Sequence, residues 1–489
     1  MAWLTKSKFL AGLQCQKRLW FEVYEPLEVL PTAGIPVLQG REFDEIVQRL
    51  EPGVVISRDH GMAAAIVETE RLLREGEPVL YQPAFRSGDL AVIADLIRRD
   101  GDSFELVEVK ASTSVKETHI PDAAFQALVI EQAGVRLKRV SIGHVNSQFE
   151  LERLDDYRGL LTETDVTGAV RASLQAVADS AERFQAVMAN GSCPPIDVGA
   201  HCTSPYDCPF MARCHPPNGT DVGYPVANLP RGGKASAALF AEGYSDLREV
   251  PAERLSSEMH RRVHAAAVSG VPYFNESATR ELRRLKPPFA YLDFETMGFA
   301  VPEIIGTGPY EQLPFQWSVH VEDAGEIRHA EYLAIESFGD FEALTEPLIA
   351  AFPPTGPIFA YNAGFEDRML RRMGELVPSS RLVLGNLADR LFDLLPVTRE
   401  AYYHRDMQGS WSIKSVIPTI APELRYGELE EVQDGGTAQL AFLELRNPEV
   451  NPDRKLILRG ALLQYCARDT EVMIVLRRFL SGDLLDAQF

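Results

Sequence analysis

The chain has 489 residues, of which 45% are hydrophobic and 24% are charged, and its formal net charge is −21. This composition is typical of soluble globular proteins, and the length allows two or three domains with cores of their own. The negative charge argues against a broad basic surface that coats nucleic acid, although it is compatible with a local basic groove. No apolar run approaches the roughly 18 residues of a membrane-spanning helix, and the N-terminus lacks a signal peptide's apolar core, so we expect a cytoplasmic protein.

Three regions follow one another along the chain. Residues 1–218 end in a stretch rich in Cys and Pro, residues 219–286 have the pattern of a helical connector, and residues 287–489 open with a strand. We expect an α/β fold at both ends, with mixed sheets and flanking helices. The predicted strands are residues 90–97, 104–112, 289–295, 315–321 and 358–363, and the predicted helices are residues 121–134, 365–376 and 458–480.

The first predicted strands carry a group of polar residues. "VIADLI" contains Asp95, and "LVEVKAS" contains Glu108 and Lys110. Alternation along a strand places Glu108 and Lys110 on one face, where Asp95 can meet them from the neighbouring strand. Two acids can bind Mg²⁺, and a lysine can orient water or stabilise a charged transition state. Gln126, on the helix that follows, can reach the same site.

This pattern of D…E-x-K resembles the PD-(D/E)XK nuclease superfamily, and within it the RecB-like nucleases, including those of CRISPR adaptation. The resemblance implies metal ligation by Asp95 and Glu108, catalysis by Lys110 and a supporting role for Gln126. Many of these relatives have a histidine four residues after a glycine. In this chain Asp44 follows Gly40 at that spacing and is itself followed by Glu45, which departs from the family pattern.

The cysteines form a further motif. Cys202, Cys208 and Cys214 are separated by five residues each in "HCTSPYDCPFMARCHP", and Cys15 lies far upstream. Clustered cysteines in a chain with no secretory features favour metal binding over disulfides. One N-terminal cysteine and three after the nuclease core resemble the iron–sulfur staple of AddB-type and CRISPR-adaptation nucleases, which implies a 4Fe–4S cluster. Structural zinc is the alternative, and the neighbouring His201 and His215 also allow mixed sites. Cys193 and Cys466 are then left over.

The middle region, from "NLPRGGKASAALFAEGYSDL" onward, reads as helix, glycine turn and helix. It faintly resembles a helix–hairpin–helix, in which backbone amides at a turn such as "RGGK" (231–234) bind a phosphate. A plain helical connector fits the pattern equally well.

The last region contains four acids and one phenol that could converge on one site. Asp293 and Glu295 alternate in "LDFET", so both point to one face of a strand. Like charges held that close repel unless a cation offsets them or a proton stays bound. "YNAGFE" adds Glu366, and "YCARD" adds Tyr465 and Asp469, which share a helix face. Such a cluster suits two divalent metals that act on a phosphodiester, with the tyrosine near the attacking water.

In this order the three motifs resemble those of DnaQ-like 3′–5′ exonucleases of the tyrosine (DEDDy) subclass, which have an RNase H-like fold. The resemblance implies that Asp293, Glu295, Glu366 and Asp469 bind Mg²⁺ or Mn²⁺ and that Tyr465 positions water. The family usually has Asp where this chain has Glu366, so Asp367 is the alternative ligand. Two further residues have open roles: Lys414 as a phosphate contact or a plain surface lysine, and Asp393 as a supporting acid or a helix cap.

The succession of RecB-like nuclease, cysteines, helical connector and DnaQ-like exonuclease resembles a bacterial family of fused nucleases catalogued as a domain of unknown function. It implies a nuclease with two sites that acts on nucleic acid, with DNA from single-stranded ends favoured and RNA as the alternative. A second hypothesis is a nucleic-acid-binding or scaffold protein in which a nuclease fold is inactive.

Overall fold

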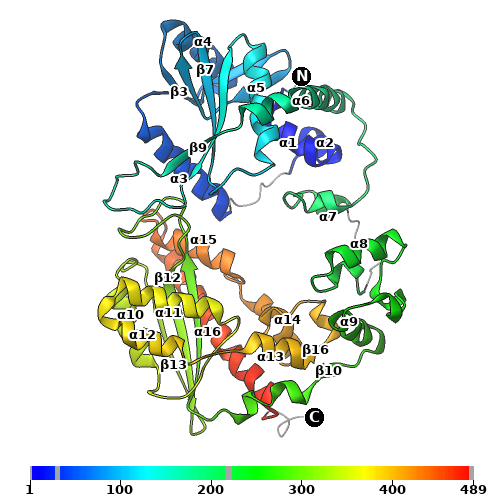
Figure 1. Cartoon of the computed structure of the whole chain (residues 1–489), viewed down its shortest axis with the longest axis vertical. Coiled ribbons are helices and arrows are strands. Elements are labelled where there is room, and N and C mark those ends of the chain that lie inside the picture. Colours follow the sequence, from blue (N-terminus) through cyan, green and yellow to red (C-terminus); the bar gives the residue numbers. More distant parts are fainter. Residues whose placement is uncertain (1–2, 28–33, 215–222, 484–489) are drawn as a thin grey trace. The chain divides into compact units, whose positions relative to one another are not determined.

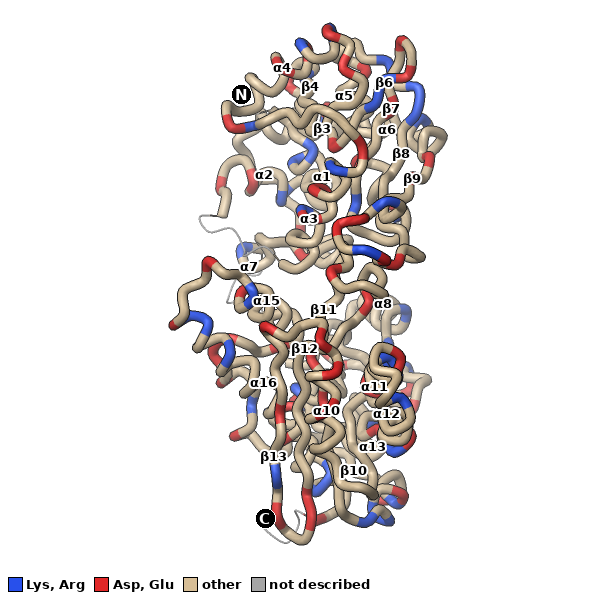
Figure 2. Tube along the Cα trace, turned by 90° about the vertical axis from the view of Figure 1, so that its left-hand side faces the viewer, with Lys and Arg blue, Asp and Glu red and all other residues tan. Residues whose placement is uncertain are grey.

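A computed structural model describes residues 3–27, 34–214 and 223–483 (Figure 1). Contacts divide the chain into two compact units: Met1–Gly219 with Gly298–Glu311, and Thr220–Met297 with Gln312–Phe489. Both units combine helices with mixed sheets, so the predicted α/β class is confirmed at that level. Acidic and basic residues are interspersed along both units (Figure 2). Among the helices of these described ranges, none is long and apolar enough to cross a membrane.

The first unit is built around a six-stranded sheet in which β7 is central. β7 pairs antiparallel with β6 and parallel with β8, and its side chains are buried on both faces through the middle of the strand. The strands in sheet order are β2 (Val54–Val55), β3 (Val79–Tyr81), β6 (Leu96–Asp100), β7 (Ser103–Lys110), β8 (Leu137–Val145) and β9 (Leu161–Asp165).

A smaller sheet and the helices complete this unit. The sheet has the order β1 (Leu4–Thr5), β5 (Leu90–Ile93) and β4 (Ala84–Ser87). The helices are α1 (Lys6–Gln14), α2 (Gln16–Tyr24), α3 (Ile35–Leu50), α4 (Gly61–Glu75), α5 (His119–Gln132), α6 (Thr167–Ala189) and α7 (Met211–Cys214). The aromatic contact between Phe9 of α1 and Phe125 of α5, with centroids 4.3 Å apart, lies in an apolar cluster of this unit.

The predicted strand 90–97 is two strands in two sheets. The break falls at Ala94 and Asp95, where the Asp95 carboxylate accepts the Val109 N–H at 2.8 Å and its carbonyl accepts the Gln82 N–H at 3.0 Å. β5 pairs with β1 and β4, whereas β6 pairs with β3 and β7. The composition of the run is uniform, so it could not show that its two halves have different partners.

Residues 298–311, which connect two strands of the second unit, pack with the first. Ala300 and Val301 are buried in a cluster with Phe43 of α3. The Leu151 N–H donates to Thr307 O at 3.0 Å. The second unit is therefore formed by two segments of the chain, Thr220–Met297 and Gln312–Phe489.

The second unit centres on a five-stranded sheet with β11 in the middle. β11 is antiparallel to β12 and parallel to β14. The strands in sheet order are β13 (Glu326–Leu333), β12 (Leu313–Asp323), β11 (Phe289–Met297), β14 (Ile358–Ala360) and β15 (Leu391–Asp393). The predicted strand 358–363 ends early, because Asn362 has a left-handed φ of 74° and its N–H donates to Asp393 at 2.9 Å.

Helices and a short ribbon complete this unit. The ribbon pairs β10 (Tyr273–Phe274) with β16 (Tyr402–Tyr403). The helices are α8 (Gly233–Ala241), α9 (Glu258–Ser269), α10 (Phe341–Ala351), α11 (Gly364–Leu376), α12 (Arg381–Ala388), α13 (Leu394–Ala401), α14 (Ile413–Val416), α15 (Gly435–Arg446) and α16 (Pro452–Ser481).

The described part of the middle region is mostly helical, apart from β10, and belongs to the second unit. "RGGK" precedes and begins α8, and Arg231 has a left-handed φ of 52°. Gly409 has a φ of +79°, and a Cβ there would meet Asn228 O at 1.7 Å, so only glycine fits this close approach. Residues 215–222, which include the predicted boundary between the first two regions, lie outside the described residues.

Candidate active sites

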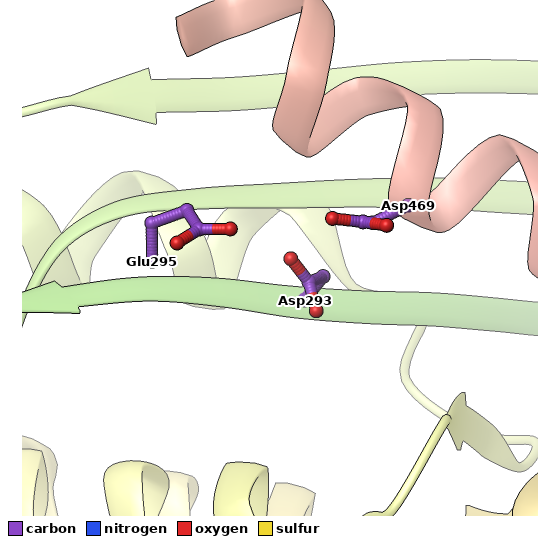
Figure 3. Close-up of side chains that lie close together, drawn as sticks. All are labelled: Asp293, Glu295 and Asp469. Carbon is purple, nitrogen blue, oxygen red and sulfur yellow. The ribbon is translucent and has the colours of Figure 1, made fainter. Parts of the chain in front are cut away.

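Three carboxylates of the second unit converge in the space between β11 and α16. Asp293 and Glu295 rise from one face of β11 toward Asp469 on α16 (Figure 3). An oxygen from each of the three lies within 4.8 Å of the others. The sequence motifs at residues 292–296 and 465–469 are therefore brought into one place although about 170 positions separate them.

Polar contacts fix α16 against the sheet beside these acids. The Gln316 amide of β12 donates to Leu462 O at 2.8 Å. Ser318, the register partner of Asp293, lies 2.8 Å from the Thr470 hydroxyl. These contacts are buried, so they set where Asp469 meets β11.

The electrostatics of the cluster favour bound protons in the absence of a cation. Burial and then the charges of Asp469 and Glu295 raise the pKa of Asp293 well above its usual value. Burial, followed by the charge of Asp469, raises the pKa of Glu295 to about 8. Burial raises the pKa of Asp469 to about 6. Bound protons or a nearby cation would therefore stabilise these acids.

Glu366 and Asp367 at the start of α11 have different surroundings. Glu366 is buried, and its charge contributes to the raised pKa of Asp293. Burial raises the pKa of Glu366 itself to about 8, and its Oε2 has no hydrogen-bond partner. The Asp367 side chain is 38% exposed and pairs with Arg371 at 3.0 Å. Asp393 accepts the Leu395 N–H and so caps α13. Of the two roles considered for Asp393, this contact is that of a helix cap.

Two tyrosines and a lysine border the acids. A hydrogen bond from Tyr465 lowers the pKa of Asp469, and burial raises the pKa of the Tyr465 phenol, so Tyr465 is a donor rather than a base. Tyr426, which sequence reasoning missed, also donates to Asp469 Oδ1. Lys414 Nζ lies 4.9 Å from the Tyr465 ring centroid, and its charge lowers the pKa of Glu295 and Asp469. It also donates to Gln433 O at 2.7 Å.

The predicted N-terminal group also lies together. Glu108 is fully buried on β7, and Gln126 of α5 donates to its Oε2 at 2.6 Å. Lys110 donates to Glu108 Oε1 at 2.5 Å. The pKa of the Asp95 carboxyl is raised well above its usual value, chiefly by burial and then by the charge of Glu108. The charge of Lys6 lowers this pKa, and a hydrogen bond from Asp95 to Glu108 raises it.

The N-terminal acids have more lysine side chains beside them than the acids of the second unit have. Burial favours the neutral form of Glu108, but the charges of Lys6 and Lys110 outweigh it and hold the pKa of Glu108 well below its usual value. Asp44 faces this group, and burial followed by the Glu108 charge raises its pKa to about 6. Glu45, the next residue, is exposed.

Three residues of these sites were not expected. Asp122 is buried and accepts from Lys110 at 2.6 Å and from Gln126 at 3.0 Å. Its position four residues before Gln126 on one helix was an available signal. Lys6, which contacts Glu108 from 102 positions away, and Tyr426, in an irregular segment, had no local signal.

All four predicted cysteine ligands line one cavity, and none is in a disulfide. The lining includes Cys15, Cys202, Cys208 and Cys214, together with His201. Burial raises the pKa of Cys208 and Cys214. Cys193 is exposed, and Cys466 is buried beside Asp293 with its Sγ 3.7 Å from Oδ2. His215 lies outside the described residues.

Comparison with known proteins finds a match to a family model over part of the second unit and two distantly similar uncharacterized proteins. The family model of DUF2779, a domain of unknown function, matches residues 290–412, which include Asp293, Glu295 and Glu366 but end before Tyr465 and Asp469. An uncharacterized protein MG366 homolog of Mycoplasma pneumoniae is 25% identical over 223 residues, 40% of this chain and 33% of the relative. The uncharacterized protein MG366 of Mycoplasma genitalium is 25% identical over 219 residues, 40% of this chain and 32% of the relative. The chain thus spans about a third of the length of these curated relatives.

Proposed function

We propose that this protein is a metal-dependent nuclease with one site in each unit. The observation that supports this best is the convergence of Asp293, Glu295 and Asp469 within 4.8 Å, with Glu366 buried beside them. Buried acids at this density are costly alone and favourable around divalent cations. No other group of three or more His, Cys, Asp or Glu side chains in the described residues meets that spacing.

The donor set fits Mg²⁺ or Mn²⁺. All four candidate ligands offer carboxylate oxygens, the hard donors that these ions prefer. Glu366 Oε2 is buried without a hydrogen-bond partner, as expected of a ligand atom in a site meant for a cation. Asp293, Glu295, Glu366 and Asp469 would hold the ion, which would supply activation of water and stabilisation of the leaving oxygen of a phosphodiester.

The neighbouring side chains have separate tasks in this proposal. Tyr465 stays protonated at neutral pH, so its hydroxyl orients the attacking water and Asp469 rather than removing a proton. Lys414 offers a positive charge to substrate phosphate at the edge of the acid cluster. Tyr426 holds Asp469 from the other side through its hydrogen bond.

In the first unit, Asp95 and Glu108 are the proposed metal ligands and Lys110 is the catalytic cation. Gln126 Oε1 is buried without a partner, while its amide nitrogen orients Glu108. Lys110 is held by both Glu108 and Asp122, which presents its ammonium group at the edge of the site. This arrangement suits stabilisation of a charged phosphate transition state.

The finer fold assignment belongs to the same proposal. The first unit would be a RecB-like PD-(D/E)XK domain, the second a DnaQ-like RNase H domain of the DEDDy subclass, and residues 219–286 a helical connector. DNA with single-stranded ends is the proposed substrate, and RNA is the alternative.

For the four cysteines we propose a 4Fe–4S cluster. The four cysteines line one cavity, so they can supply the four thiolates that such a cluster needs. Structural zinc is the alternative, because it takes the same ligands.

The test is cleavage of end-labelled single-stranded DNA and RNA by the full chain with Mg²⁺, Mn²⁺ or EDTA. The wild type should cleave only with metal. The double variant Lys110→Ala, Asp469→Asn should lose activity by about a hundredfold or more, because it removes a charge-stabilising group from one site and a ligand from the other. Equal cleavage by the wild type and the double variant, or no cleavage by the wild type, would reject the proposal. Metal-free binding of the same strands would then favour the scaffold alternative.

A further inference from the structure

Lys6 is held in the N-terminal site by elements on both sides of it. It begins α1 directly after β1, whose Leu4 and Thr5 pair with Leu90 and Ala91 of β5. Further along α1, Phe9 is fully buried and stacks on Phe125, the neighbour of Gln126. The helix ends at Cys15, one of the four cysteines. The backbone of Lys6 is therefore part of the built site rather than of a loose N-terminal arm.

Two ammonium groups share one oxygen of Glu108. Lys6 Nζ donates to Glu108 Oε1 at 2.7 Å, and Lys110 Nζ donates to the same atom at 2.5 Å. Gln126 occupies Oε2. In this arrangement Glu108 has no oxygen free of a donor, although it is the proposed metal ligand.

The two lysines differ in what else holds them. Lys110 has a second close carboxylate, Asp122 Oδ2, at 2.6 Å. Lys6 has Asp122 Oδ1 only at 3.9 Å, whereas the exposed fractions of the two side chains are alike, 27% for Lys6 and 25% for Lys110. A divalent cation on Glu108 repels both ammonium groups, and the less anchored one yields first. The long lysine stem lets the freed ammonium reach another anion beside the site.

We propose that Lys6 is a phosphate-binding residue that neutralises Glu108 in the metal-free site and turns to the substrate's phosphodiester when a divalent cation binds. The proposal rests on the nuclease function proposed above for the first unit. It predicts effects of opposite sign on two quantities. Loss of the Lys6 charge removes a competitor of the metal, and it also removes a contact to the substrate.

The test compares Lys6→Met with Lys6→Arg and with Lys8→Met as a matched control. Lys8 lies on the same helix and donates only to Trp3 O among the described contacts. All variants are made in an Asp293→Asn, Asp469→Asn background, so that Mn²⁺ bound by calorimetry reports the first unit. We expect Lys6→Met to bind Mn²⁺ about tenfold more tightly and to raise KM for single-stranded DNA about tenfold, equivalent to the loss of one charged contact.

Lys6→Arg keeps the charge and should stay within about threefold of the background protein in both quantities, as should Lys8→Met. Lys6→Gln is the second neutral variant and should behave as Lys6→Met, which covers a folding defect specific to methionine. Unchanged or weaker Mn²⁺ binding by the neutral variants, or an unchanged KM, would overturn the role of Lys6. Failure of Glu108→Gln to reduce Mn²⁺ binding and cleavage would instead reject the metal site itself.

Discussion

At the scale of a residue, the two adjacent acids at the start of α11 show how burial can distinguish a candidate metal ligand from a surface acid. Sequence left Glu366 and Asp367 as alternative ligands. Glu366 is 4% exposed and is electrostatically coupled to Asp293, whereas Asp367 pairs with Arg371 in solvent. Of these two acids, Glu366 is therefore the one that lies beside Asp293.

The raised pKa of Glu366 gives a prediction for metal-free stability. The folded pKa is about 8 and the ordinary value is 4.5, so the unfolded chain binds fewer protons between these limits. The contribution of Glu366 to stability is therefore complete below about pH 4.5 and is lost as the pH rises toward 8, by about 1 kcal/mol per pH unit. Glu366→Gln should remove this loss. The free energy of unfolding of the variant should therefore exceed that of the wild type by an amount that grows with pH.

Denaturant unfolding in EDTA at several pH values between 5 and 8 measures that difference. Asp367→Asn is the matched control, and it should follow the wild-type pH dependence because Asp367 lies outside the acid cluster. A constant difference between Glu366→Gln and the wild type would contradict the coupling of Glu366 to the site. Added Mn²⁺ should reverse the ranking, since the wild type then regains a ligand-to-metal contact.

At the scale of elements, α1 joins two sites of the first unit. Lys6 at its start contacts Glu108, and Cys15 at its end lines the cysteine cavity. A helix of nine residues spans about 13 Å, so it is a short, direct link. Loss of the cysteine site should therefore destabilise α1, the helix that positions Lys6.

This link makes Cys208→Ser informative. We expect wild-type protein purified without oxygen to be brown and to contain iron, and Cys208→Ser to lose both the colour and several kcal/mol of stability in the first unit. Cys193→Ser is the control, because Cys193 is exposed and lies outside the cavity lining. Iron analysis and thermal melts decide the question. A colourless wild type with one zinc per chain would contradict the iron assignment and keep the four-ligand site.

The sequence allowed prediction of elements with strong periodicity and of residues within short motifs. β11 and α16 were predicted because an apolar, aromatic run surrounds Asp293 and a long helical pattern surrounds Asp469. The division of residues 90–97 between two sheets was missed, because sheet membership depends on partners far along the chain. Lys6 and Tyr426 were missed for the same reason, since each meets its acid only after folding.

At the scale of the whole molecule, the net charge of −21 opposes a polyanionic substrate. Binding of nucleic acid then depends on local cations, and Lys6, Lys110 and Lys414 lie beside the two acid clusters. Divalent ions at those acids would reverse the local sign of charge where the substrate binds. The acidity of the chain and the proposed activity are therefore compatible.

The central claim is that the acids of the second unit form a metal-dependent nuclease centre. Its most direct test follows single-turnover digestion of end-labelled single-stranded DNA in Mn²⁺, with the first unit disabled by Lys110→Ala. This protein should shorten the strand stepwise from one end. Adding Asp293→Asn should abolish the stepwise products by about a hundredfold or more while the protein stays folded, because a ligand is lost but the buried charge is relieved. Undiminished stepwise digestion by the double variant would contradict the claim.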